Sequence, residues 1–561
     1  MNAAPRHRWW QDLDAEPFTW HVPDEFNIAH ACLDVQRPDD TALIVDTGDT
    51  STRHSFGEVA ALSRRFAAAL REFGLAAGDR IGVMVPQGLE VLTAHLGAFR
   101  AGMVTVPLSV KFGGDAVAHR LRDSGARVLV VDADCFARVR DGLTDVPSLA
   151  AILVVGDAPA GQAMVRSFAE TLTAAAEDTH TAATGPDTPA IIIYTSGTTG
   201  RPKGALHGHR VLLAHMPGVR TAFENAPQPG DVFWTPADWA WIGGLFDVLF
   251  PALALSCPVV ATPGAFTPDR ALTVMRAHRI TAAFLPPTAL KQMRSAGVDR
   301  AAATGTHLRA LASGGESLGQ ALQHWVHDTF GAPVNEFYGQ TEMNLTVGTA
   351  RTRWSAEPGS MGRAFPGFTV TVLDDTGAPA PPGETGEICV AAGNPGQFLG
   401  YWNQPGTTAE KVHDGWIHTG DLGRADTAGN LWYQGRLDDV ISSAGYRIGP
   451  GEIEECLLTH PAVAMAAVIG VPDDLRGEAV HAFVVPTDGV TGTDGVTGTD
   501  GVTGTDDVTG TDDLRRALQD HVKSRLAFYQ YPRRITFLDE LPMTTTGKIL
   551  RRELRHLAAD G

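Results

Sequence analysis

Short apolar runs alternate with helix-periodic segments along this chain, and this order restricts the fold more than any other feature of the sequence. Apolar side chains recur at helical spacing over 59–73, and 80–85 then has the pattern of a buried strand. A helical stretch at 89–100 and a second strand pattern at 103–108 repeat the order. Strand–helix alternation predicts an α/β architecture with largely parallel sheets.

The chain is too long for a single hydrophobic core, since it has 561 residues. The pattern of predicted elements changes near 435–439, and the elements beyond this point are shorter. They are helix patterns at 452–458 and 514–526, and strand patterns at 465–469 and 481–485. We therefore predict a large N-terminal domain of several α/β subdomains, residues 1–437, and a small α+β C-terminal domain, residues 438–561.

A tandem repeat interrupts the second domain. Residues 489–494, 495–500 and 501–506 are each GVTGTD, and 507–512 is the variant DVTGTD. Regular aspartates in a glycine-rich tract are typical of calcium-binding β-rolls, but those have a nine-residue period. We predict a polar surface loop over 488–513.

Composition excludes several classes of protein. The sequence is 43% hydrophobic and 19% charged, and this composition argues against disorder. Its formal charge of -19 argues against binding to nucleic acid or anionic lipid. A local pocket can still attract an anionic ligand. The most apolar stretch, 249–261, is too short to span a bilayer, so stable membrane insertion is not expected. Five scattered cysteines favour a reducing compartment, and we expect a cytoplasmic protein.

The stretch Tyr194–Gly204, YTSGTTGRPKG, carries the strongest chemical signal. It follows the apolar run 190–193, so it lies at the end of a predicted strand. Glycines let several backbone N–H groups face one point, and the hydroxyls and the lysine add donors and charge, which suits a triphosphate. The spacing is not that of a Walker A loop. The phosphate-binding residues predicted here are Thr195, Ser196, Gly197, Thr198, Thr199, Gly200 and Lys203.

This string resembles the phosphate-loop signature of the adenylate-forming superfamily, which includes acyl-CoA synthetases, luciferases and the adenylation domains of peptide synthetases. The resemblance extends from about Phe18 onward, the repeat tract excepted, and is greatest to the medium-chain and acetyl-CoA-synthetase-like enzymes. It implies the adenylate-forming enzyme fold, in which a small mobile C-terminal domain rotates about a hinge at Asp438.

Further motifs follow in the order that this family has. In NEFYGQTE, over 335–342, the resemblance implies that Tyr338 stacks on adenine, Thr341 binds the α-phosphate and Glu342 ligates Mg²⁺. Taken alone, Tyr338 would indicate core packing, and only the surrounding motif favours a binding role. The other nucleotide-binding residues that the resemblance implies are Gly315, Glu316 and Ser317 beside adenine, Gly339, Gln340, Asp421 at the ribose hydroxyls, Arg436 and Arg447.

The same resemblance implies a two-step ligase with ATP, Mg²⁺ and CoA. The substrate carboxylate attacks the α-phosphorus of ATP, and Lys548 in the PMTTTGK loop, together with Thr341 and Glu342, assists this step. The CoA thiol then attacks the acyl-AMP carbonyl and expels AMP. The loop that forms the pantetheine tunnel matches Ser443, Ala444 and Gly445.

The residues of the acyl pocket point to an acid larger than acetate. In acetyl-CoA synthetases a tryptophan stands where this chain has Gly339, and the lining positions Gly243 and Gly314 are also glycines. This suggests a short-to-medium, branched or aromatic monocarboxylic acid. The pocket set is completed by Trp239, Trp241 and Ile242, and the two tryptophans either fill the pocket or pack in the core.

Two other functions are compatible with these motifs. The enzyme could load a carrier protein, which would be a separate protein, in place of CoA. Alternatively the chain could be a non-catalytic sensor of ATP or acyl-AMP. The presence of Lys203, Glu342, Asp421 and Lys548 argues against a sensor, because a binder has no need of a mobile lysine. The sequence specifies no oligomeric state.

Overall fold

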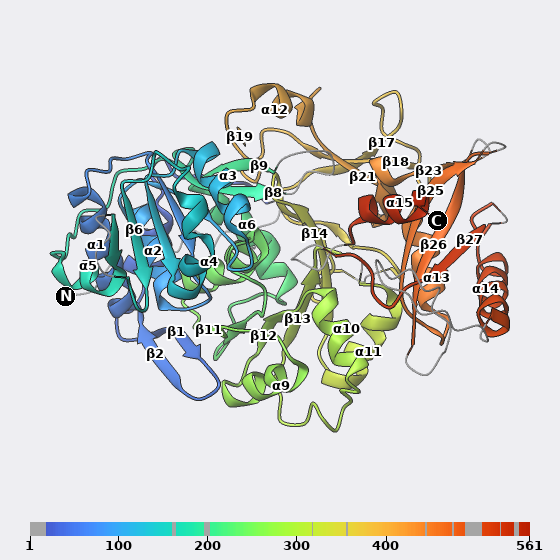
Figure 1. Cartoon of the computed structure of the whole chain (residues 1–561), viewed down its shortest axis with the longest axis horizontal. Helices are drawn as coiled ribbons and strands as arrows, with labels where there is room; N and C mark the ends of the chain where they lie inside the picture. Colours follow the sequence, from blue (N-terminus) through green and yellow to red (C-terminus); the bar gives the residue numbers. More distant parts are fainter. Residues whose placement is uncertain are drawn as a thin grey trace.

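Sheets with helices packed on their faces build the N-terminal part of the chain, and a smaller sheet builds its C-terminal end (Figure 1). This arrangement comes from a computed structural model that describes residues 18–159, 164–195, 202–316, 318–354, 357–443, 446–473, 476–487, 508–527, 529–543 and 549–560. Within these ranges the strands form four sheets. The predicted α/β class is confirmed.

An eight-stranded sheet forms from the early strand–helix alternation. Its pairing is parallel from β8 to β7 and antiparallel where β9 and β19 are added. In spatial order its strands are β19 (Gly400–Tyr401), β9 (Lys203–Gly208), β8 (Pro189–Thr195), β4 (Val104–Pro107), β3 (Arg80–Met84), β5 (Val128–Asp132), β6 (Ala151–Val155) and β7 (Val165–Ser167). The helices between them are α2 (Leu89–Arg100), α3 (Gly114–Ser124), α4 (Ala133–Leu143) and α5 (Phe168–Ala174).

A nine-stranded sheet contains the second half of the N-terminal part. It is parallel from β14 to β1 and antiparallel at both edges. Its strands in order are β16 (Arg363–Ala364), β15 (Asn344–Gly348), β14 (Val334–Gln340), β13 (Ala310–Gly314), β12 (Ala282–Phe284), β10 (Phe233–Trp234), β11 (Val259–Ala261), β1 (Thr41–Asp46) and β2 (Ser51–Ser55). Helices α9 (Pro268–Ala277), α10 (Pro287–Ser295) and α11 (Gln320–Phe330) belong to this half.

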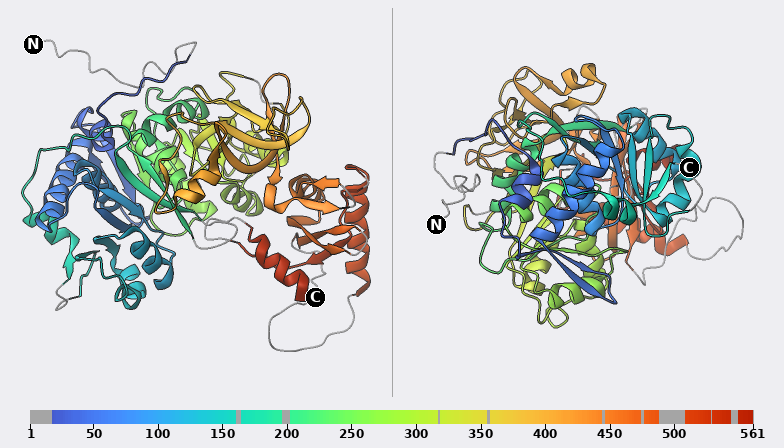
Figure 2. Two further views of the ribbon diagram at one scale, coloured as in Figure 1. Left: turned by 90° about the horizontal axis from the view of Figure 1, so that it is seen from above. Right: turned by 90° about the vertical axis from the view of Figure 1, so that its left-hand side faces the viewer.

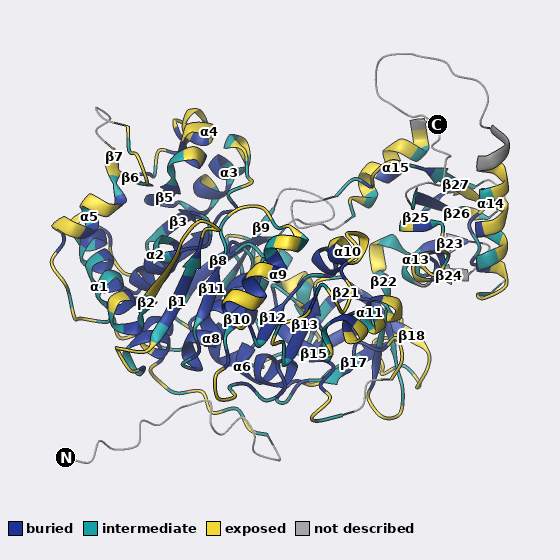
Figure 3. Cartoon of the chain, turned by 90° about the horizontal axis from the view of Figure 1, so that it is seen from below, coloured by how far each residue is buried: buried dark blue, intermediate teal, exposed yellow. Residues whose placement is uncertain are grey.

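One apolar core joins the two large sheets (Figure 3). It includes buried residues of α1 (Phe56–Glu72), α2, α6 (Arg210–Ala222), the π-helical turn η3 (Leu245–Leu249) and α8 (Phe250–Ala254). Helix α1 begins with a capping box, in which Ser55 Oγ accepts from Glu58 N at 3.1 Å and Glu58 Oε2 accepts from Ser55 N at 2.8 Å. Such a cap contributes about 1 kcal/mol and sets where the helix starts.

Two smaller sheets follow. The third contains β17 (Val370–Leu373), β18 (Thr385–Ala391), β21 (Trp416–Ala425), β20 (Val412–His413) and β22 (Leu431–Arg436), with α12 (Pro405–Lys411) beside it. The fourth contains β24 (Tyr446–Ile448), β23 (Ile441–Ser443), β26 (Gly477–Pro486), β25 (Val463–Asp473) and β27 (Arg534–Phe537). The proposed boundary at Asp438 falls between these sheets, in the short helix η4 (Leu437–Asp439).

The C-terminal elements stand beside the rest of the molecule and have an apolar cluster of their own (Figure 2). Helices α13 (Pro450–Leu458), α14 (Val508–Lys523) and α15 (Arg551–Asp560) accompany the fourth sheet. The predicted loop over 488–513 is wrong at its end, because α14 begins within the repeat tract; residues 488–507 lie outside the described ranges. An ion pair between Asp512 and Arg515 at 2.7 Å, one helical turn apart, supports this longer helix.

No helix in the described part of the chain is long and apolar enough to cross a membrane.

Candidate active site

The predicted phosphate loop connects two adjacent antiparallel strands. Strand β8 ends at Thr195 and β9 begins at Lys203, and these two residues are register partners. The ammonium of Lys203, the first residue of β9, lies 5.4 Å from the centre of the Tyr401 ring. The predicted residues Ser196, Gly197, Thr198, Thr199 and Gly200 lie outside the described ranges.

Asp421 is the centre of a polar cluster formed by three strands. It is 3% exposed, and its Oδ2 accepts hydrogen bonds from the Tyr338 hydroxyl and from Gln340 Nε2, both at 2.6 Å. Its Oδ1 accepts from Arg436 Nη1 at 2.9 Å. Burial and the Asp421 carboxylate raise the pKa of Tyr338 well above its usual value, so this hydroxyl remains a donor. The structure thus brings together four residues that were predicted from three separate motifs.

Two residues that the sequence reasoning missed complete this cluster. Lys411, at the end of α12, donates to Gln340 Oε1 at 2.8 Å and to the Thr419 carbonyl at 3.1 Å. Burial lowers the pKa of Lys411, and the neighbouring carboxylates oppose this change. The Tyr401 hydroxyl donates to Glu342 Oε1 at 2.6 Å. Neither residue lies in a motif that sequence reasoning could single out.

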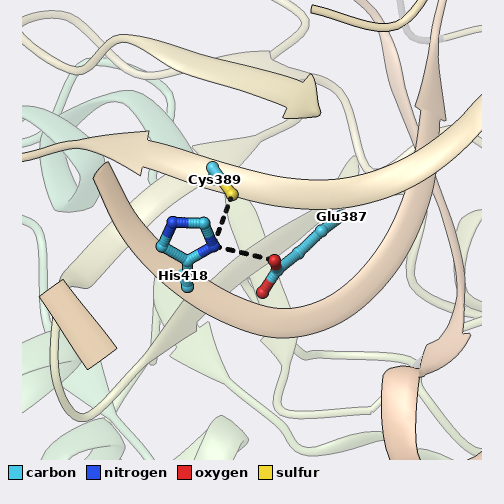
Figure 4. A group of neighbouring side chains, drawn as sticks. All are labelled: Glu387, Cys389 and His418. Carbon is cyan, nitrogen blue, oxygen red and sulfur yellow. Dashed lines mark hydrogen bonds and ion pairs between the residues drawn. The ribbon is translucent and has the colours of Figure 1, made fainter. Parts of the chain in front are cut away.

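Next to the turn at 419–421 lie three neighbouring side chains, those of Glu387, Cys389 and His418 (Figure 4). Glu387 Oε1 accepts from Gly420 N at 2.8 Å, and its Oε2 lies 2.8 Å from His418 Nδ1. Cys389 Sγ is 3.6 Å from the same nitrogen. Burial, with the Glu387 carboxylate, raises the pKa of the Cys389 thiol to about 12. We assign the cluster to shaping this turn, in which Gly420 has a φ of 71°.

Thr341 and Glu342 occupy the turn after β14. Glu342 is 8% exposed, and its backbone carbonyl accepts from Phe398 N at 2.9 Å. The backbone of Thr341 hydrogen bonds the buried His207 ring of β9, whose pKa burial lowers to about 4. The turn after β14 is therefore anchored to β9, the strand that follows the predicted phosphate loop.

The loop after β13, which was predicted to lie against adenine, is described only in part. Gly315 has a φ of 90°, which favours glycine, and Glu316 Oε2 is 3.9 Å from Lys291 Nζ. Ser317 lies outside the described residues, while the next backbone N–H, of Leu318, donates to Glu336 Oε1 at 3.0 Å. Glu336 thus fixes the far end of this loop to β14.

The glycines assigned to the acyl pocket have different surroundings. A Cβ on Gly339 would lie 2.0 Å from the Asn344 carbonyl oxygen, and one on Gly314 would lie 2.5 Å from the Phe337 ring. Close packing thus requires glycine at both positions, so they do not by themselves measure the volume of a pocket. A Cβ on Gly243 would be 3.4 Å from its nearest neighbours, which is ordinary contact.

The pocket tryptophans also differ from each other. Trp239 is 1% exposed and belongs to the central core, as core packing would require. Trp241 is half-buried and meets the Phe112 ring edge-on at 5.9 Å. Ile242 is half-buried at the start of α7 (Ile242–Gly244).

The residues predicted to act from the C-terminal part are described unevenly. Ser443 is buried at the end of β23, and Arg447 lies on β24. Asp438 Oδ1 is 3.4 Å from Arg436 Nε, so the proposed hinge touches the Asp421 cluster. Ala444, Gly445 and the proposed catalytic residue Lys548 lie outside the described ranges.

Comparisons with known proteins agree along almost the entire chain. The family model of the AMP-binding enzymes matches residues 31–402, and that of the AMP-binding enzyme C-terminal domain matches 452–548. The mitochondrial acyl-coenzyme A synthetase ACSM4 of Homo sapiens is 32% identical, over 98% of this chain and 94% of that protein.

Solved structures of acid–CoA ligases share the fold. The anthranilate CoA ligase AuaEII, in complex with anthranoyl-AMP, superposes with a TM-score of 0.85 at 26% identity, over 96% of this chain and 99% of that one. A benzoate CoA ligase from Burkholderia xenovorans LB400 gives a TM-score of 0.81 at 28% identity, over 94% and 100%. With the phosphate loop, the Asp421 cluster and both family domains present in order, the chain belongs to the AMP-binding enzyme family.

Proposed function

We propose that this protein is an ATP-dependent acyl-CoA synthetase acting on a short-to-medium, branched or aromatic carboxylic acid larger than acetate. It converts acid, ATP and CoA to acyl-CoA, AMP and diphosphate through an acyl-AMP. The observation that carries this proposal is the arrangement around Asp421, on which Tyr338, Gln340 and Arg436 converge. Relatives that are acyl-CoA synthetases, matched along nearly the full chain, support it.

In the first half-reaction the Asp421 carboxylate would bind the ribose hydroxyls of ATP, exchanging contacts with its present donors. Tyr338 presents its ring to the adenine, and Lys203 faces the phosphates. A substrate carboxylate oxygen attacks the α-phosphorus, a new P–O bond forms, and diphosphate leaves. Most of the catalysis is positioning and neutralisation of charge. Lys548 would bridge the acid and the α-phosphate.

Glu342 would be a suitable ligand for a magnesium ion. Its carboxylate is a hard oxygen ligand, and the Tyr401 hydroxyl holds only Oε1, at 2.6 Å. When bound there, Mg²⁺ would offset negative charge on the phosphates. Thr341, beside it, would contact the α-phosphate.

In the second half-reaction the CoA thiol, losing its proton, attacks the acyl-AMP carbonyl. The C–S bond forms, the C–O bond to AMP breaks, and AMP leaves. We propose that the C-terminal domain rotates about Asp438 and brings the 443–445 loop to the pantetheine arm. Closure excludes water, which would hydrolyse the mixed anhydride. We place the reaction in the cytoplasm, because all five cysteines are buried and unpaired.

The first experiment supplies Mg-ATP, CoA and a panel of two- to twelve-carbon, branched and aromatic acids, and measures AMP and thioester together. Matched AMP and acyl-CoA from one group of acids is the expected result. AMP or acyl-AMP without thioester would redirect the proposal to a carrier-protein acceptor. Acetate as the best substrate would refute the proposed size of the acid, and ATP binding without turnover of any acid would indicate a sensor.

A second experiment separates the half-reactions with Lys548→Ala. This variant should lose acyl-AMP formation, measured by pyrophosphate exchange, and keep thioester formation from supplied acyl-AMP, because the lysine serves only the first step. Equal loss of both activities would refute the role assigned to Lys548.

A further inference from the structure

An acidic side chain is buried where the chain is otherwise apolar. Asp247 lies in η3 and is 5% exposed, and the turn has π-helical geometry, a form frequent at functional sites. Its Oδ2 is 3.4 Å from the point where a Cβ on Gly243 would lie, and Phe284 Cε1 is equally close to that point. The Phe284 ring stacks on Phe337 at 5.2 Å. Asp247 therefore adjoins the region proposed above to receive the acyl chain.

The protonation state of Asp247 depends on its neighbour His215, on α6. His215 Nδ1 lies 2.7 Å from the Val211 carbonyl, which only accepts, so this nitrogen bears the hydrogen. Burial lowers the pKa of His215 to about 3, so the ring is neutral and its Nε2 offers a lone pair. Nε2 lies 3.6 Å from Asp247 Oδ1. An ionised carboxylate facing a lone pair in this setting would be unfavourable.

Asp247 must therefore face His215 as a carboxylic acid. Burial raises its pKa well above the usual value, which agrees with this geometry. Oδ1 has no hydrogen-bond partner in the structure, because His215 Nε2, at 3.6 Å, lies beyond hydrogen-bond distance. The hydrogen of the acid is nevertheless best placed on Oδ1, facing that lone pair, and Oδ2 then remains a carbonyl-type acceptor. Among the residues that the structure describes, no hydrogen bond reaches Oδ2, and the side chain is 7% exposed although it lies in the interior. An acceptor in this position is costly unless a donor reaches it.

We propose that Asp247 is a specificity-determining residue, whose Oδ2 accepts a hydrogen bond from an uncharged hydroxyl or aromatic amino group on the acyl part of the substrate. His215 is its positioning residue. This inference rests on the proposed acyl-CoA synthetase activity and narrows its substrate to a substituted acid. An aliphatic ammonium group is disfavoured, because a neutral carboxylic acid cannot compensate a buried positive charge.

The test compares matched pairs of acids with the whole enzyme: benzoate against its 2-, 3- and 4-hydroxy and amino derivatives, and butyrate against its hydroxy derivatives. Pyrophosphate exchange reports kcat/KM for adenylation alone. In at least one pair the wild-type enzyme should prefer the donor-bearing acid by about 10- to 100-fold, the loss expected for one unpaired buried acceptor.

Two substitutions separate recognition from folding. Asp247→Leu, which is apolar and of similar size, should abolish the preference while unsubstituted acids keep their rate. Asp247→Asn should retain most of it, because the amide can donate to His215 Nε2 and still present a carbonyl oxygen. Should Asp247→Leu fail to fold, the proposal is still tested by whether the wild-type enzyme prefers the donor-bearing acid and whether Asp247→Asn keeps that preference.

Each outcome has a defined meaning. A preference that disappears in Asp247→Leu and persists in Asp247→Asn supports the proposal. Equal rates for every matched pair in the wild-type enzyme, or a preference unchanged in Asp247→Leu, would overturn it and leave the synthetase activity standing. AMP from no acid at all would overturn both proposals.

Discussion

Replacing Glu336 by glutamine should stabilise the protein above neutral pH. This half-buried carboxylate on β14 accepts from Leu318 N at 3.0 Å and from Gln323 Nε2 at 3.2 Å. Burial raises the pKa of Glu336 from its ordinary value of 4.5 to about 7, and the Glu455 carboxylate acts in the same direction. The folded protein thus holds a proton here that the unfolded chain releases at lower pH.

The sign of the effect follows from this difference. Between about pH 4.5 and 7 the folded state binds more protons than the unfolded state at Glu336, so stability falls as pH rises through this window and levels off above it. At 1.36 kcal/mol per pH unit, the difference between the two pKa values corresponds to at most about 3 kcal/mol. Glutamine has no charge to bury, so the variant should lack this loss while its oxygen still accepts from Leu318 N.

Thermal unfolding followed at pH 5, 6, 7, 8 and 9 would check this. The Tm of Glu336→Gln should equal that of the wild type near pH 5 and exceed it by several degrees at pH 8 and 9. Glu384→Gln, at an exposed glutamate, is the matched control and should change Tm little at any pH. A Glu336→Gln variant that is less stable than the wild type at pH 8, or a constant difference across the series, would refute the reasoning.

Two predictions concern residues of the proposed nucleotide site. Lys411→Met removes donors to Gln340 Oε1 and the Thr419 carbonyl, and should raise KM for ATP about 10-fold with little change in kcat; an unchanged KM in pyrophosphate-exchange assays would contradict this. Tyr401→Phe removes the donor to Glu342 Oε1 and should raise the Mg²⁺ concentration that gives half-maximal activity several-fold; a magnesium titration that matches the wild type would argue against the proposed metal ligand.

The parts of the fold and site that the sequence predicted are those encoded over short distances. Apolar runs located strands β3, β4 and β8 of the eight-stranded sheet, because each of these strands is a short continuous apolar segment. No strand of the nine-stranded sheet was predicted from the sequence. The hydroxyls and glycines between Thr195 and Lys203 share one loop, so their chemistry was visible without a structure. Tyr338 and Asp421 are far apart in the chain, and only the family resemblance joined them before the hydrogen bond between them was seen.

The residues that were missed owe their roles to contacts between distant elements. Lys411 ends a short helix with no motif, and only the fold, which packs α12 against β20 and β21, brings it to Gln340. Gly339 was interpreted as leaving room in the acyl pocket. Instead, the β-bulge that brings the Asn344 backbone against Gly339 requires glycine at this position. Asp247 did leave a signal, a single acid within the apolar run LFDVLF, but its partner His215 could not be paired with it from sequence.

Arg436 links the boundary between the two parts of the chain to the Asp421 cluster through two ion pairs. One guanidinium meets Asp421 at 2.9 Å and Asp438 at 3.4 Å, so a single side chain spans the distance between them. A guanidinium is planar and its donors are fixed in direction, so it cannot improve its fit to one acid without changing its fit to the other. Binding of the ribose hydroxyls at Asp421, as proposed above, would therefore change the contact of Arg436 with Asp438 at the proposed hinge.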